Sequence, residues 1–232
     1  MNAVAAWGAF LVVLLAGWSL GVFSLRAAGV RLPTGKGGFC FGMLVSAAVG
    51  LLFLSYFVFL SFRLGIYLGQ GTAWIACGLA VLFGILGGKS FPRESSPEPL
   101  SLKSRTPLQR FALAGIVAAC LCILIACVLI PLKSYDARMI WAFHAKLIYA
   151  SGTHPAPELL REGFVIGHPQ YPPLFPLAMA LVAAIRGELY EPAMRMVAVL
   201  FYFAVLALLL FELPRHENRW GFLLVAVYAL TP

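Results

Sequence analysis

The sequence predicts an all-α, polytopic integral membrane protein with about seven transmembrane helices. Hydrophobic residues make up 62% of the chain, charged residues make up only 11%, and the mean hydropathy is +0.92. A soluble domain has roughly 45–50% apolar and about 25% charged residues, so it could not bury this much apolar surface. The composition therefore excludes a soluble globular fold.

Long runs without charged residues predict the first four spans. Each run reaches the roughly 20 residues that a helix needs to cross the hydrocarbon core; they cover residues 1–25, 37–62, 64–88 and 111–132. No Lys or Arg precedes the first run, which is also longer than the apolar part of a signal peptide, so we expect a retained membrane anchor. Shorter runs, interrupted by Pro or Gly, predict three further spans at about residues 171–186, 193–212 and 220–232.

A polar segment, residues 89–110, divides the chain. Its four prolines and several serines are typical of a flexible linker. Before it lie three N-terminal helices, residues 1–88, whose role the sequence does not indicate. After it comes a second module, residues 111–232. In the first part, Gly17 and Gly21 have the spacing that favours close packing between membrane helices.

The loop charges predict the orientation. Residues 26–36 hold three basic residues and the linker holds five, while Arg63 is the one basic residue of the intervening loop. The positive-inside rule then places the linker in the cytoplasm and the long loop 133–170 outside a plasma (inner) membrane. Strict alternation of the later spans would also put Arg215 and Arg219 outside, against the rule.

The net charge of +8 does not indicate a nucleic-acid partner. In a membrane protein, basic loop residues report orientation and contact with anionic membrane lipid.

Ionisable groups are concentrated in the loop 133–170. It holds three of the four histidines and Asp136, the one aspartate of the chain. Such a concentration beside the bilayer is a functional-site hypothesis. A solvated loop, which needs polar residues in any case, is the alternative.

Part of this loop has the pattern of an amphipathic helix. Ser134 can cap its start, residues 137–149 lack Pro and Gly, and Gly152 stands where a helix would end. An apolar stripe of Ile140, Phe143, Leu147 and Ile148 lies beside Arg138, His144 and Lys146. We therefore expect a helix that lies in the membrane interface and holds Asp136 at the water boundary.

Two segments of the loop resemble a known family. The first is Tyr135-Asp136-Ala137-Arg138-x-x-Trp141-x-x-His144-Ala145-Lys146-x-x-Tyr149, and the second is His168-Pro169-Gln170-Tyr171-Pro172-Pro173-Leu174. In order, spacing and placement between spans they resemble the start of the conserved module of C-type glycosyltransferases, in an arrangement that covers roughly residues 111–232. These polytopic enzymes use polyprenyl-phosphate-linked sugars and include protein mannosyltransferase-like and lipid A aminoarabinose transferase-like members.

The resemblance implies an enzyme that transfers a sugar from a polyprenyl-phosphate donor to a lipid, glycan or protein acceptor. Asp136 matches the acidic residue that serves as catalytic base or metal-linked carboxylate. A positioned base contributes about 10²–10⁴-fold. Lys146, Arg138 and His168, in that order, are the candidates for stabilising the departing phosphate. Tyr171 is expected either to stack on a sugar or to anchor the loop.

The sequence departs from the family in three respects. Three extra helices precede the module, and the resemblance says nothing about them. Many relatives carry a second acidic residue directly after the first, where this chain has Ala137, so a requirement for a divalent metal stays open. Relatives also continue through more spans, so we expect the chain to be the N-terminal part of such an enzyme or an inactive truncation. The alternative function is a non-catalytic lipid-binding or assembly subunit. A transporter ranks last, because the spans carry no charge at their centres.

Overall fold

The structure, a computed structural model, is all-helical in the part of the chain that it describes. It describes residues 3–30, 36–90, 106–130, 140–156, 172–212 and 221–230, and within these ranges there is no β-strand. The helices are α1 (Ala3–Ala27), α2 (Lys36–Arg63), α3 (Gln70–Ser90), α4 (Pro107–Leu129), α5 (Phe143–Ser151), α6 (Leu174–Arg186), α7 (Glu191–Glu212) and α8 (Gly221–Leu230). The predicted all-α class is confirmed.

In the part of the chain that the structure describes, five helices are long and apolar enough to cross a membrane. They are α1, α2, α3, α4 and α7, with apolar stretches of 18 to 24 residues. The protein is therefore an integral membrane protein. The other two predicted spans correspond to α6 and α8, which have 13 and 10 residues. At 1.5 Å per residue α6 is about 20 Å long, shorter than the roughly 30 Å hydrocarbon core.

Glycines bring α1 and α2 into backbone contact. A Cβ atom added at Gly21 would lie 1.8 Å from the Ser46 carbonyl oxygen, and one added at Gly50 would lie 1.8 Å from the Gly17 oxygen. Helices in lipid gain no hydrophobic free energy from association, so this close van der Waals packing is what holds them together. The packing predicted for Gly17 and Gly21 is confirmed.

The fourth helix begins inside the predicted linker. The Thr106 side chain accepts a hydrogen bond from the Gln109 amide, the Gln109 side chain accepts one from the Thr106 amide, and Pro107 occupies the first helical position. This capping box satisfies amides that would otherwise lack partners, so the helix starts at Pro107 instead of at residue 111.

Helices from before and after the linker share one core. The larger buried cluster combines residues of α1, α2 and α3 with residues of α5, α6 and α7. Helix α6 is its centre, because every residue from Pro176 to Ile185 is buried and the helix packs against α1, α2, α3, α5 and α7. A smaller cluster joins α4 and α8 to the far part of α7.

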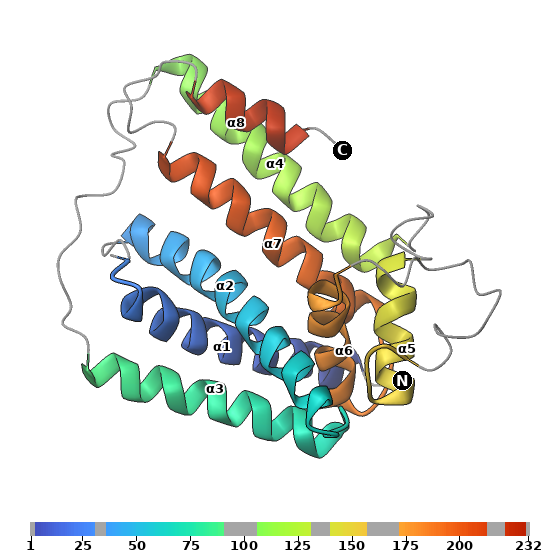
Figure 1. Cartoon of the computed structure of the whole chain (residues 1–232). Coiled ribbons are helices and arrows are strands. Elements are labelled where there is room, and N and C mark those ends of the chain that lie inside the picture. Colours follow the sequence, from blue (N-terminus) through green and yellow to red (C-terminus); the bar gives the residue numbers. More distant parts are fainter. Residues whose placement is uncertain are drawn as a thin grey trace.

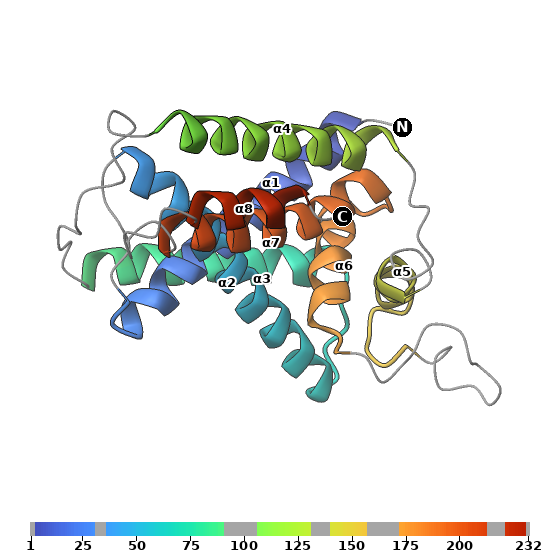
Figure 2. The same ribbon diagram turned by 90° about the horizontal axis from the view of Figure 1, so that it is seen from above.

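Helices α5 and α6 lie crosswise at one end of the bundle. Both run across the long helices at the end that also holds the chain's N-terminus and the α2–α3 turn (Figures 1 and 2). Helix α7 starts at this same end, so α6 does not carry the chain to the opposite end. Helix α6 has 13 residues and is buried among other helices, so the described structure does not confirm a membrane span at residues 171–186.

Helix ends that flank the basic segments of the sequence lie at the opposite end of the bundle. The ends of α1, α3 and α7 and the starts of α2, α4 and α8 lie there (Figure 1). The segments 26–36, 89–110 and 213–220, which contain or join these helix ends, hold ten of the 17 Lys and Arg residues. Arg215 and Arg219 lie between α7 and α8 in the sequence, outside the described ranges.

Candidate functional site

Helix α5 is fixed at both of its ends. Gly152 ends it in the left-handed conformation with φ of 70°, as expected, and the Gly152 carbonyl accepts a 2.6 Å hydrogen bond from the Leu68 amide of the α2–α3 turn. Just before the helix, Trp141 packs edge-on against Phe175 of α6, with 5.6 Å between the ring centroids. These contacts hold the side chains of α5 in a defined place at the end of the bundle.

Lys146 of α5 lies in a cluster of charged side chains. Its Nζ atom donates a hydrogen bond of 3.3 Å to Oε2 of Glu191, the first residue of α7. The other oxygen of that carboxylate lies 3.9 Å from Nε of Arg195, one turn further along α7. Lys146 and Glu191 are partly exposed, with side-chain accessibilities of 38% and 32%, whereas that of Arg195 is 10%.

Arg195 ties the cluster to a third helix. Its guanidinium group donates a 2.5 Å hydrogen bond to the carbonyl oxygen of Ile130, which ends α4. A cation at a helix C-terminus also interacts favourably with the helix dipole. Among the described side chains, the Lys146 cluster (Lys146, Glu191 and Arg195) thus sets two cations against one carboxylate where α4, α5 and α7 meet.

A second ion pair at the same end is balanced. Arg186, at the end of α6, pairs with Glu188 and lies 5.0 Å from the Tyr190 ring centroid. It has one cation for one carboxylate, so it leaves no positive charge for a ligand.

The two histidines near α5 are buried or partly buried. His144 has no solvent exposure and lies on the face of α5 that packs into the bundle, not on a polar face with Lys146 as expected. His154 lies just beyond the helix, 6.1 Å from the Phe59 ring. Burial, followed by the charge of His144, lowers the pKa of His154 below its ordinary value of 6.5. His154 therefore favours the neutral form in the folded protein.

One predicted site residue lies among the described residues. Lys146 is placed as stated above, while Asp136, Arg138, His168 and Tyr171 lie outside the described ranges. The Lys146 cluster contains two residues that sequence reasoning missed.

A signal for these two residues was present in the sequence. Glu191 directly precedes Pro192 at a helix start, and Arg195 follows four residues later in an otherwise apolar run. Charges at this spacing at the start of a span are themselves a functional-site hypothesis. What the sequence could not show is that Lys146, 45 residues earlier, meets them.

Within the described ranges, no three His, Cys, Asp or Glu side chains come together as a metal site. The Lys146 cluster has one carboxylate and two cations, so its charges favour binding of an anion over binding of a metal cation.

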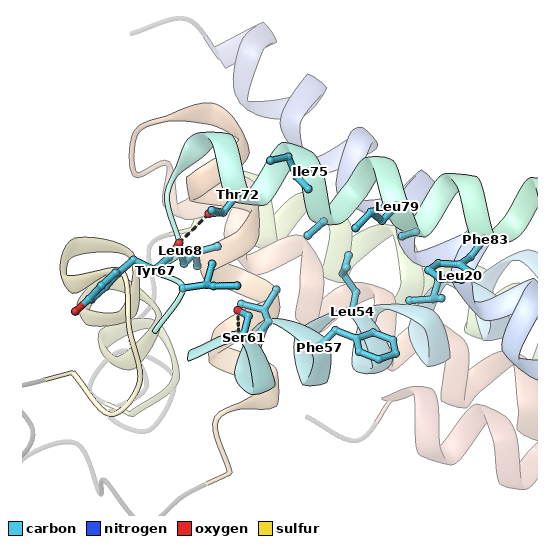
Figure 3. Close-up of a pocket in the computed structure, with 14 residues that line it drawn as sticks. Leu20, Leu54, Phe57, Ser61, Tyr67, Leu68, Thr72, Ile75, Leu79 and Phe83 are labelled. Atoms are coloured by element: carbon cyan, nitrogen blue, oxygen red, sulfur yellow. Dashed lines mark hydrogen bonds between the residues drawn. The ribbon is translucent and has the colours of Figure 1, made fainter. Parts of the chain in front are cut away.

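An apolar groove of about 460 Å³ lies between α2 and α3 (Figure 3). Both helices pack on α1, so Leu20 of α1 lines the groove between them. Phe57 of α2 and Ile75 and Phe83 of α3 are among its other lining residues, and all three are about half exposed. The groove therefore opens on an exposed apolar surface of the bundle.

The Ser61 and Thr72 hydroxyl groups at the end of the groove are already bonded within the protein. Ser61 Oγ donates to the Val58 oxygen at 2.7 Å, and Thr72 Oγ1 donates to the Tyr67 oxygen at 2.9 Å (Figure 3). With so little polar surface left, the groove suits a hydrocarbon chain better than water.

No protein-family model matches the chain, and no curated protein or solved structure is significantly similar to it.

Proposed function

We propose that the chain is part of a membrane glycosyltransferase that moves a sugar from a polyprenyl-phosphate donor to a lipid, glycan or protein acceptor outside the cytoplasm. The observation that carries this proposal is the Lys146 cluster. Lys146, a phosphate-binding candidate from the sequence, lies beside Arg195 at the end of the bundle, with one carboxylate between them. An excess of positive charge at this boundary suits a lipid phosphate.

The membrane placement in this proposal follows from the helix ends. The end with the basic segments faces the cytoplasm of a plasma membrane, by the positive-inside rule. The end with α5 then faces outward, and α5, which runs across the long helices (Figures 1 and 2), lies in the outer interface. Basic residues beside this interface meet lipid headgroups directly.

The proposed chemistry divides the work between a base and cations. An acceptor hydroxyl oxygen attacks the anomeric carbon of the sugar, and the bond from that carbon to the phosphate oxygen breaks. Asp136 takes the hydroxyl proton, and the polyprenyl phosphate leaves with one more negative charge. Lys146 and Arg195 stabilise this developing charge, with Arg138 and His168 as further candidates and Tyr171 beside the sugar.

Asp136→Asn tests the proposal. The chain is reconstituted in vesicles with a polyprenyl-phosphate donor that carries a radiolabelled sugar, and transfer to acceptor is counted. The variant should lose about 10²-fold or more of the rate while inserting normally. Glu188→Gln is the matched control, because it removes a carboxylate that only balances Arg186; its rate should stay at the wild-type level. Equal rates for wild type and Asp136→Asn would refute the assignment.

The groove between α2 and α3 favours a second candidate, a lipid-binding or assembly subunit without catalysis. Its lining is almost wholly apolar and opens toward lipid. This function predicts that the purified chain retains polyprenyl phosphate but transfers no sugar under the same assay conditions.

A further inference from the structure

The Lys146 cluster contains one firm contact and one that can open. Arg195 is nine-tenths buried and is held by the Ile130 carbonyl oxygen, so it cannot move without exposing an unpaired end of α4. The Lys146–Glu191 pair is different, because both side chains are about one-third exposed and their atoms are 3.3 Å apart. Exposed ion pairs of this kind contribute little, and the long lysine side chain is flexible.

Glu191 therefore competes with any anion for Lys146. An incoming phosphate meets a lysine that already has a carboxylate partner, and that carboxylate repels it. A phosphodiester carries one negative charge, no more than Glu191 itself, so it gains little by replacing the carboxylate. A phosphate monoester carries about −1.5 to −2 at neutral pH, so it can draw Lys146 away while Glu191 stays beside Arg195.

We infer that Glu191 is a specificity-determining residue that reserves Lys146 for a doubly charged phosphate monoester and excludes the singly charged phosphodiesters of bulk membrane lipid. This inference rests on the proposed function, in which Lys146 binds a lipid phosphate. It also deepens that function. A polyprenyl-phosphate sugar is a diester, and its phosphate gains the second charge only as the bond to the sugar breaks. Lys146 would then leave Glu191 for the leaving group as the transition state forms, which is differential binding of the transition state.

The test compares two lipids on two proteins. Wild type and Glu191→Gln are placed in phosphatidylcholine vesicles that contain either polyprenyl phosphate, a monoester, or phosphatidylglycerol, a diester, and binding of each lipid is titrated. Wild type should prefer the monoester. In Glu191→Gln the diester should bind more tightly and the preference should fall by about tenfold, because a repulsive charge within a few ångströms of the phosphate is gone. An unchanged preference overturns the inference.

Matched variants separate the possible failures. Glu188→Gln removes the same charge from the same end of the bundle and should leave the preference unchanged. If Lys146→Met binds both lipids as well as wild type does, the phosphate site of the proposed function is wrong. If Lys146→Met loses binding but Glu191→Gln keeps the preference, the role of Glu191 alone is wrong.

Two further arms complete the design. Glu191→Asp keeps a counter-charge for Arg195 but draws the carboxylate away from Lys146. It should therefore lower the preference for the monoester by less than Glu191→Gln does. This variant replaces Glu191→Gln in the test if Glu191→Gln does not fold. Inorganic phosphate in solution replaces the lipids in a parallel titration. If wild type binds inorganic phosphate more tightly than polyprenyl phosphate, the ligand is a free phosphate; an unchanged preference between the two lipids in Glu191→Gln still overturns the inference. No change with any of the three anions overturns the inference.

Discussion

Replacing Arg195 by methionine tests whether the Lys146 cluster holds the end of the bundle together. Methionine keeps most of the apolar stem but removes the guanidinium group, which donates to the Ile130 oxygen at 2.5 Å and lies 3.9 Å from Glu191. A hydrogen bond from a charged donor is worth about 1.5–3 kcal/mol, and the partly exposed ion pair adds about 0.2–1 kcal/mol. We expect Arg195→Met to lower the free energy of unfolding by about 2–4 kcal/mol.

The measurement is equilibrium unfolding in mixed detergent micelles, followed by circular dichroism. Arg63→Met is the control, because Arg63 is exposed at the same end of the bundle and lies 5.9 Å from the Phe59 ring. That exposed cation–π contact is worth about 0.5–1 kcal/mol. If both variants lose the same small amount, Arg195 does not join α4 to α7, and the reasoning about the cluster fails.

Three other predictions concern the helix packing, His154 and the groove. Gly21→Ala puts a methyl group 1.8 Å from the Ser46 oxygen and should cost about 3 kcal/mol or more, whereas Gly8→Ala, with no atom within 4 Å, should stay within about 1 kcal/mol of wild type in the same unfolding assay. Because the pKa of His154 is lowered in the folded state, the unfolded chain binds more protons below pH 6.5. Stability should therefore be full above that pH, fall as the pH drops toward the folded-state pKa and level off below it; His154→Gln should flatten a melting-temperature series from about pH 7.5 to about pH 5. Ala76→Phe should fill part of the groove and reduce the lipid that co-purifies, measured by native mass spectrometry; undiminished lipid would mean that the groove is not where it binds.

The long helices and several of their ends are readable in the sequence because their causes are local. Charge-free runs predict α1 to α4 from composition alone, and Gly152 predicts the end of α5 because a left-handed residue there costs glycine little. Pro173 and Pro176 likewise mark the start of α6. These signals act within one helix or one turn, so no partner is needed to interpret them.

The burial of α5 was predicted less well. Its apolar stripe suggested a polar face that includes His144, yet that histidine is fully buried against the bundle. The sequence pattern marks which residues are apolar, but the packing face of a short helix depends on which neighbours surround it. Here α6 packs along α5 and covers a face that the sequence alone leaves open.

By itself, the sequence determined that this is a helical membrane protein, where the five long helices of the described ranges lie, and which segment holds three of the four histidines and the one aspartate. Only the tertiary structure decided that α6 stays at one end of the bundle instead of running to the opposite end. It also decided that Glu191 and Arg195 meet Lys146. The physical reason is the distance along the chain over which each interaction acts. Hydrophobic runs and caps act between neighbours in the chain, whereas an ion pair between residues 45 positions apart exists only after the helices have packed.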